Sequence, residues 1–486
     1  MASEEALTID QQIDLWFQPI QEVTSNVIFY SFPLSETQNV PYILLWLMGA
    51  AIFFTIYLGF ANIRYFKHAI DLVRGKEDKI NDDGQISRFQ ALMTSLSGTV
   101  GLGNISGVAI AISTGGPGAM LWMIVLGFFG MSSKFAEVML AVKYRHHPDP
   151  DRPDRISGGP MYYLKAAFEN RNIPYLGSIM GIFFALCVML GAIGGGNMFQ
   201  ANQAYQQVKI ATGGADSIIA EAGWVFGLGL ATLVGLVIVG GIKSIANVAS
   251  KLVPTMGIIY LIAGLIVIGL HFQQIPSAIM LVFAEAFSPS AAYGGILGVL
   301  LVGAQRAFFS NESGLGSAAI VHATAKTNNP VSQGFVGMLG PFIDTVVICS
   351  ITAMVIVITD SYKVTGDVEG IALTSRAFES TLPGFQYILT LTVFLFAFST
   401  MITWAYYGTK GVTYIFGEKK LPDMVFKLFF CLCIIIGASA EMKQMVDFTT
   451  AAIFSLAIPN IIGLYMLAPE IRKDLKEYAK NLKKDK

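Results

Sequence analysis

The sequence predicts an all-α polytopic membrane protein with about 11 transmembrane helices. The chain has 486 residues, of which 54% are hydrophobic and only 13% are charged, and its mean hydropathy is +0.59. Apolar runs recur along the whole chain at about the 20-residue length that a membrane-spanning helix needs. A transmembrane β-barrel would instead show short segments of alternating hydropathy. The net charge of −1 gives no indication of a nucleic-acid partner.

The chain divides into an N-terminal segment, one extra span, a core of ten spans and a tail. Residues 1–39 contain no Lys or Arg, and Ile13, Trp16, Phe17 and Ile20 recur at helical spacing. This pattern predicts an amphipathic helix on the extracytoplasmic membrane surface, with a frayed tail as the alternative. The predicted spans are residues 40–62, 87–113, 115–142, 177–201, 223–241, 247–270, 294–318, 334–358, 386–415, 425–440 and 446–468.

The distribution of Lys and Arg predicts the orientation in the cell (inner) membrane. With eleven spans and the N-terminus outside, 26 of the 32 basic residues fall in inner loops, near the inner ends of spans or in the tail. Positive residues are enriched on the cytoplasmic side of membrane proteins. We therefore expect an outer N-terminus and a basic cytoplasmic tail at residues 469–486.

Two glycine-containing interruptions stand at corresponding places in the ten-span core. Residues 87–270 and 294–468 each hold five spans, and an odd number inverts the second copy relative to the first. Ser97–Gly107 interrupts the first span of one half, and Phe308–Gly316 interrupts the first span of the other. The first interruption alone could be a small-residue packing face. As a pair, the interruptions predict two broken helices around a transport site.

Several motifs resemble those of the alanine/glycine:cation symporter family. They are Gly98-Thr-Val-Gly-Leu-Gly-Asn104-Ile, Gly115-Gly-Pro-Gly-Ala119, Phe309-Ser-Asn-Glu312, Phe342-Ile-Asp344-Thr345, and Ser399-Thr400 with Trp404-Ala-Tyr-Tyr-Gly408. The resemblance runs from about residue 40 to 468. It implies the amino-acid/sodium symporter fold with five-plus-five inverted repeats. The chain departs from the family pattern at Leu121-Trp122-Met123-Ile124, where Phe-Trp-Met-Trp is usual, and at Gly127.

The resemblance also implies a substrate site at the broken helices. Thr99, Gly101 and Gly103 would present a hydroxyl or backbone amides to the carboxylate of an amino acid, since a side chain in place of glycine would block backbone approach. Asn104 would brace the unwound turn or bind the substrate, with helix capping as the alternative. The other expected lining residues are Gln200, Phe309, Ser310 and Trp404. Gln200 could instead satisfy a neighbouring helix.

For the cation, the expected ligands are Ser399, Thr400 and Thr403 together with carbonyls near Ser97 and Val100. Sodium is a hard cation that prefers several oxygen ligands, but hydroxyls in membrane helices also bond back to their own helix.

Ionisable groups inside spans are costly and are usually paired or functional. Glu312 is expected to accept backbone N–H bonds at the second break, and Asp344 is expected to cap or pair similarly. Lys134 and Glu137 are three residues apart and are expected to pair.

These observations predict a secondary active symporter that imports alanine or glycine with sodium by alternating access. Sodium is then a co-transported ligand, and no other cofactor is expected. The alternatives are a proton-coupled transporter working through Glu312, or a channel or receptor on the same scaffold. No pattern typical of a catalytic site falls within the spans, so an enzyme is not expected. The sequence leaves open the amino acid and its enantiomer, the stoichiometry, and the oligomeric state.

Overall fold

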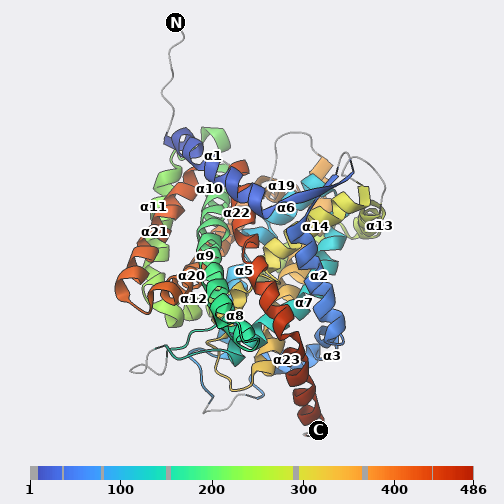
Figure 1. The fold of residues 1–486 in the computed structure, drawn as a ribbon. Coiled ribbons are helices and arrows are strands. Elements are labelled where there is room, and N and C mark those ends of the chain that lie inside the picture. The colour runs from blue at the N-terminus through green and yellow to red at the C-terminus, as the bar shows by residue number, and fades with distance from the viewer. Residues whose placement is uncertain are drawn as a thin grey trace.

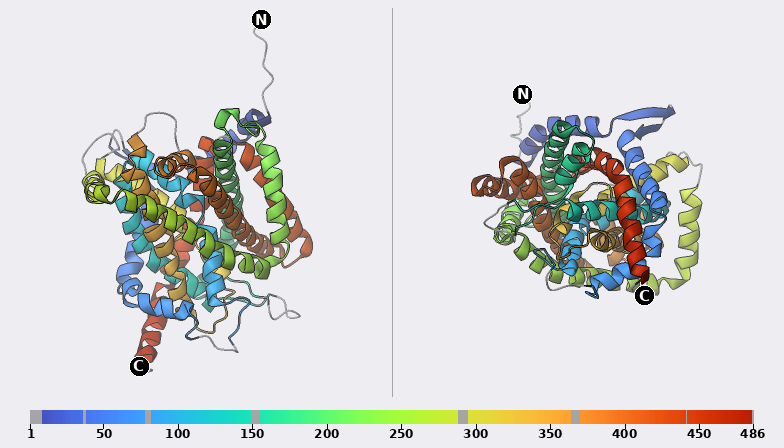
Figure 2. Two further views of the ribbon diagram at one scale, coloured as in Figure 1. Left: turned by 180° about the vertical axis from the view of Figure 1, so that it is seen from behind. Right: turned by 60° about the horizontal axis from the view of Figure 1, so that its bottom comes forward.

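The computed structural model of the chain describes residues 9–35, 38–77, 82–148, 155–287, 295–363, 370–440 and 442–484. Within these residues the protein is almost entirely helical (Figure 1). Helix α1 and the end of the last helix, α23, lie at opposite ends of the molecule (Figures 1 and 2).

The N-terminal segment contains the predicted helix followed by a hairpin that the sequence analysis did not predict. Helix α1 spans Ile9–Ile28, and the antiparallel strands β1 (Ser31–Ser35) and β2 (Gln38–Pro41) follow it. The hairpin is short and contains Pro33 and Pro41, which explains why alternation of apolar residues gives no strand signal. Residues 1–8, 36 and 37 of the predicted segment lie outside the described part.

The first half of the core begins with a broken helix and carries an extra short helix. After α2 (Tyr42–Tyr57), α3 (Ala61–Arg64) and α4 (Phe66–Val73), the break separates α5 (Arg88–Thr99) from η1 (Leu102–Asn104) and α6 (Ser106–Gly115). The remaining elements are α7 (Ala119–Lys143), α8 (Pro160–Glu169), α9 (Pro174–Ile193), η2 (Gly194–Met198), α10 (Phe199–Ala211), η3 (Gly214–Asp216), α11 (Gly223–Ile238), α12 (Gly241–Leu270), η4 (Phe272–Gln274) and α13 (Ile275–Ala286).

The second half repeats this order. Helix α14 (Gly295–Asn311) is separated from α15 (Ser317–His322) by a break, and a short helix, α19 (Ile371–Glu379), again stands between the second and third spans. The other elements are α16 (Pro330–Gly337), α17 (Leu339–Pro341), η6 (Phe342–Cys349), α18 (Ser350–Ile358), η7 (Ser361–Lys363), α20 (Phe385–Phe416), α21 (Lys420–Ser439), α22 (Met442–Phe454) and α23 (Ala457–Lys484).

By length and composition, seven helices of the described chain could cross a membrane, or eight if the pair Arg88–Thr99 and Leu102–Gly115 is one span. The other three predicted spans correspond to α2, α11 and α14, which have 16, 16 and 17 residues. The predicted span 40–62 ends early because the chain turns at Gly59 and Phe60, both with positive φ. The predicted tail is not a separate element, because α23 continues as a helix to Lys484.

Helix α7 holds the two halves together. It packs against α2, α14, α15 and α16, and its stretch Gly130–Val142 is buried throughout. Helix α20 packs against α5, α9, α10 and α12. The two broken helices are thereby enclosed by α7 and α20.

Candidate functional site

The first break is a sharp bend whose freed backbone groups are satisfied by side-chain amides. Helix α5 and the following helical segment are bent by 59°. The N–H of Gly101 donates to Asn104 Oδ1 at 2.9 Å, and the N–H of Leu102 donates to Gln200 Oε1 at 3.1 Å. A Cβ at Gly101 would lie 2.5 Å from Thr400 Oγ1, so glycine is required for this close approach.

The second break is held by polar groups from neighbouring helices. Glu312 has φ 54°, which is unusual for a residue with a side chain. Lys134 Nζ donates to the Glu312 carbonyl at 2.7 Å, and Asn460 Nδ2 donates to the Gly314 carbonyl at 2.9 Å. The N–H of Gly316 donates to Glu137 Oε1 at 3.2 Å. The expected Lys134–Glu137 pair is present, with 3.7 Å between Nζ and Oε2.

The role expected for Glu312 therefore needs correction. Its carboxylate accepts hydrogen bonds from two side chains, Ser317 Oγ and Trp404 Nε1, rather than from backbone N–H groups. Glu137 receives the backbone N–H instead, because it projects from α7 directly against the break, whereas the positive φ of Glu312 turns its own side chain toward Ser317 and Trp404.

Trp404 connects the two breaks. Its indole N–H lies 3.3 Å from the Gly98 carbonyl on α5 and 3.2 Å from Glu312 Oε1 at the second break. The ring is buried, and a Cβ on Gly196 would lie 2.2 Å from its Cγ. The glycine run of residues 194–196 is thus explained in part by the bulk of this indole.

Asp344 forms a second connection between the breaks. Its Oδ1 accepts from Asn104 Nδ2 at 2.7 Å, and its Oδ2 accepts from Ser310 Oγ at 2.7 Å. Thr345 Oγ1 donates to the same Oδ2, also at 2.7 Å. Asn104 therefore braces the first break from inside and ties it to the second. Bracing was one of the two roles expected for it, and it uses both ends of the side-chain amide.

The residues expected to hold the cation lie together between α5 and α20. Thr400 Oγ1 donates to the Ser97 carbonyl at 3.0 Å, and Thr403 Oγ1 lies 3.1 Å from Ser97 Oγ. Ser97 Oγ in turn donates to the Ser399 carbonyl at 2.6 Å. Val100 directly follows the last residue of α5, so its carbonyl is placed at the break. The Ser399 hydroxyl points elsewhere, toward the Phe396 carbonyl of its own helix, as the back-bonding alternative anticipates.

Of the residues expected to bind the amino acid, Phe309 lies at the first break, whereas the polar groups of Gln200 and Thr99 are already engaged in hydrogen bonds. Phe309 is buried, stacks edge-on against Phe199 and lies 3.4 Å from the position of a Cβ on Gly103. The Gln200 amide is engaged at both ends, since its Nε2 also donates to the Gly195 carbonyl at 2.9 Å. The Thr99 hydroxyl points back to the Ser95 and Leu96 carbonyls at 3.4 Å each, so it is not aimed away from its helix.

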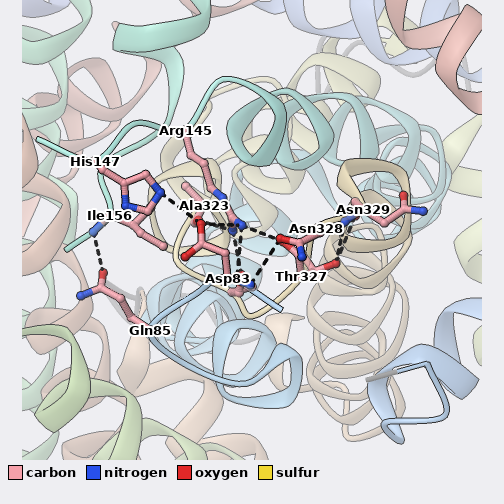
Figure 3. Close-up of polar contacts among 10 residues, drawn as sticks. Asp83, Gln85, Arg145, His147, Ile156, Ala323, Thr327, Asn328 and Asn329 are labelled. Carbon is pink, nitrogen blue, oxygen red and sulfur yellow. Dashed lines mark hydrogen bonds and ion pairs between the residues drawn. The ribbon is translucent and has the colours of Figure 1, made fainter. Parts of the chain in front are cut away.

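A polar network around Arg145, just after the end of α7, is not predicted by the sequence (Figure 3). Arg145 NH1 donates to the Ala323 and Ala325 carbonyls at 3.3 and 3.0 Å, and its NH2 donates to the Asp83 and Thr327 carbonyls at 3.0 and 2.8 Å. NH2 also lies 3.1 Å from Asp83 Oδ2. We call these residues the Arg145 network. It fastens the segment before α5 to the segment after α15, which also pair directly between Ile86 and Ala325.

Only one feature of the sequence could have drawn attention to Arg145, namely its place in a loop rich in basic residues. A basic loop predicts which side of the membrane the loop lies on, but it does not predict the hydrogen bonds that Arg145 forms. The carbonyls that Arg145 binds belong to segments far from it along the chain, and no local pattern encodes them.

With this geometry established, comparison with known proteins gives the family. Residues 27–486 match the model of the sodium:alanine symporter family. The chain belongs to this family. The sodium/alanine symporter AgcS of Methanococcus maripaludis is 38% identical over 441 residues, which cover 90% of this chain and 94% of the relative. The probable sodium/glutamine symporter GlnT of Bacillus subtilis is 32% identical over 442 residues, which cover 90% of this chain and 88% of the relative.

The fold matches that of a solved structure. A crystal structure of MhsT in complex with L-phenylalanine aligns with a TM-score of 0.56 at 14% identity, covering 81% of this chain and 98% of that chain. This likeness concerns the fold alone. Together the family and the fold confirm the predicted multi-pass α-helical membrane protein and the predicted class of function. The chain is a sodium-coupled amino-acid symporter, not an enzyme and not a channel.

Proposed function

We propose that this symporter imports a small neutral amino acid, alanine or glycine, together with sodium by alternating access. The observation that carries the proposal is the meeting of two broken helices whose polar interiors are joined by Trp404 and by Asp344. Paired broken helices of this kind are where symporters of inverted-repeat design place their ligands.

The cluster between α5 and α20 supports a sodium site. The Thr400 hydroxyl lies 3.0 Å from the Ser97 carbonyl oxygen, and the Thr403 hydroxyl lies 3.1 Å from the Ser97 hydroxyl. These oxygens are hard donors, suited to a hard cation, and Ser399 and Val100 would add carbonyl oxygens. Sodium entering this cluster would replace the Thr400–Ser97 hydrogen bond with ion–oxygen contacts.

The amino acid is proposed to bind beside this cluster, with its carboxylate at the amides of Thr99, Gly101 and Gly103. The Gly101 N–H donates to Asn104 Oδ1 at 2.9 Å, so the carboxylate would have to replace Asn104 at this amide. Buried aromatic rings at Phe309 and Trp404 leave little room for a side chain, which favours alanine or glycine over larger amino acids. In this structure, the side chains of Asn104 and Gln200 accept hydrogen bonds from backbone N–H groups of the break, so in this state they would support the ligand site and not bind the ligand directly. Ser310 would act similarly through Asp344.

Coupling follows from the shared backbone of the first break. Sodium at Ser97 and Val100 would order the turn whose amides receive the carboxylate, so each ligand would raise the affinity for the other. The Arg145 network would keep one side closed in the present state and would separate when the site opens there. With the outer N-terminus and cytoplasmic C-terminus proposed above, that side is cytoplasmic.

The test is uptake of labelled alanine into proteoliposomes under an inward sodium gradient, compared with a sodium-free control at equal membrane potential. We expect accumulation only with sodium, and counterflow of labelled alanine against unlabelled alanine. Uptake of glutamine but not alanine or glycine would refute the proposed pocket. Accumulation driven by a pH gradient without sodium would refute sodium coupling and assign that role to Glu312 instead.

A further inference from the structure

A cavity away from the broken helices has six basic side chains in its lining. Its volume is about 420 Å³, and it lies among the end of α11, the start of α12, the last turns of α20 and the start of α21. The basic residues that line it are Arg155, Lys243, Lys410, Lys419, Lys420 and Lys427, whereas Glu418 and Asp423 are the acidic ones.

Both acidic residues already have basic partners. Glu418 Oε1 lies 3.1 Å from Lys410 Nζ, and its Oε2 lies 3.7 Å from Arg155. Asp423 Oδ2 lies 2.9 Å from Lys427 Nζ. Lys419 and Lys420 form no ion pair among the residues that the structure describes. The cavity therefore keeps an excess of positive charge after its internal pairs are formed.

Further groups in the cavity can donate hydrogen bonds to an anion. The hydroxyls of Tyr406 and Thr409 are buried and have no hydrogen-bond partner within the described chain. Two long helices, α12 and α21, also begin at the cavity, and the amides of a first helical turn favour negative charge. A buried hydroxyl without a hydrogen-bond partner costs free energy, so binding of a ligand that accepts its hydrogen bond would be favoured.

Exposed apolar side chains beside the cavity favour a lipid as the source of the anion. Val239 lines the cavity and is 64% exposed, and Leu236 on α11 is 73% exposed. On α21, Leu421 and Leu428 are 74% and 65% exposed. These apolar side chains belong to membrane-facing helices, so acyl chains would lie against them while a headgroup occupied the basic cavity beside them.

We propose that this cavity binds the phosphate headgroup of an anionic phospholipid. Lys419 and Lys420 attract the phosphate at the mouth, and the Tyr406 and Thr409 hydroxyls donate to its oxygens inside. Because α20 carries both Tyr406 and Thr403 one turn apart, a lipid seated here contacts the helix that also lines the proposed sodium cluster. The lipid site itself does not depend on which amino acid is transported.

The experiment is native mass spectrometry of the full chain in detergent, titrated with phosphatidylglycerol or with phosphatidylcholine of identical acyl chains. We expect one phosphatidylglycerol to bind at least tenfold more tightly than phosphatidylcholine. The double variant Lys419→Gln, Lys420→Gln should reduce that preference about tenfold, since each basic residue near an anionic membrane surface contributes on the order of a fewfold in affinity. The matched control is Lys473→Gln, Lys476→Gln on α23, which removes equal charge from exposed positions.

A second variant, Tyr406→Phe, separates a seated headgroup from diffuse attraction because it leaves the charge unchanged. It should weaken phosphatidylglycerol binding about threefold to tenfold, the usual effect of one lost hydrogen bond. Equal binding of the two lipids, an unchanged Tyr406→Phe variant, or an equal effect of the control pair would each overturn the proposal. Displacement of the lipid by inorganic phosphate at equal affinity would assign the cavity to a soluble anion and would also overturn it.

Discussion

Replacement of Arg145 by alanine should shift the protein toward a state that is open at the Arg145 network. Four hydrogen bonds join its guanidinium to carbonyls of two segments, and its side chain is only 9% exposed. In the proposed mechanism these segments separate when the site opens, so the bonds would stabilise only the closed state. Arg145→Ala would therefore lower the stability of the closed state relative to the open state and leave the other contacts of both states unchanged.

The size of the shift can be worked from these contacts. A neutral hydrogen bond contributes about 0.5–1.5 kcal/mol net, and one to a charged group such as this guanidinium contributes about 1.5–3 kcal/mol, so four contribute at least roughly 2–6 kcal/mol. The ion pair with Asp83 adds little because that carboxylate is 42% exposed. A shift of about 3 kcal/mol changes the ratio of closed to open molecules roughly 150-fold.

A buried cysteine reports the shift. Ser95 lies within α5 and is buried, so Ser95→Cys in a background without the four native cysteines should react slowly with a membrane-impermeant maleimide. In inside-out vesicles, adding Arg145→Ala should accelerate labelling at least tenfold. Arg171→Ala is the control, since that exposed arginine makes one 3.4 Å bond to the Met466 carbonyl. Unchanged labelling in the Arg145 variant would refute the role of the network.

Three further substitutions test the site. Thr400→Ala should raise the sodium concentration for half-maximal uptake about tenfold, which corresponds to ~1.4 kcal/mol. Thr400→Ser retains the hydroxyl and should leave that concentration unchanged. An unchanged sodium dependence in the alanine variant would remove this residue from the cation site. Trp404→Phe deletes the donor shared by the two breaks and should cost roughly 2–4 kcal/mol of stability, seen as a lower thermal midpoint in detergent, because it leaves the Glu312 carboxylate one donor short. Gly127→Ala places a Cβ 2.8 Å from Thr345 Cγ2 and should lower the stability of the protein by about 1–3 kcal/mol. Adding Thr345→Ser, which removes that methyl group, should recover part of the loss. Strict additivity of the two changes in stability would contradict the predicted clash.

The Gly127 contact also explains one departure from the family pattern. The Thr345 side chain occupies the space that a Cβ at this position would need, and the Thr345 hydroxyl donates to Asp344 and accepts from Asn311 Nδ2. Glycine here therefore belongs with the packing of the second break. The departure at Ile124 has no explanation in the structure.

The sequence alone determined the class of the molecule and the position of its two breaks. Long apolar runs force helices because lipid offers no partner for backbone amides, and glycine within such runs is tolerated only where protein or polar groups replace that partner. Both signals are local, so they can be recognised at Ser97–Gly107 and Phe308–Gly316 without knowledge of the fold. The family motifs added residue roles that remain predictions until transport is measured.

Only the tertiary structure decided which side chains form hydrogen bonds with the free backbone groups at the two breaks. Asn104 and Gln200 bind backbone amides of the first break, and Glu137, not Glu312, receives a backbone N–H of the second. Sequence spacing cannot give these pairings, because a polar side chain buried in a membrane protein bonds to whichever neighbouring helix reaches it. The Arg145 network is the clearest case: its acceptors are backbone carbonyls, which every residue type carries, so their positions are set by packing alone.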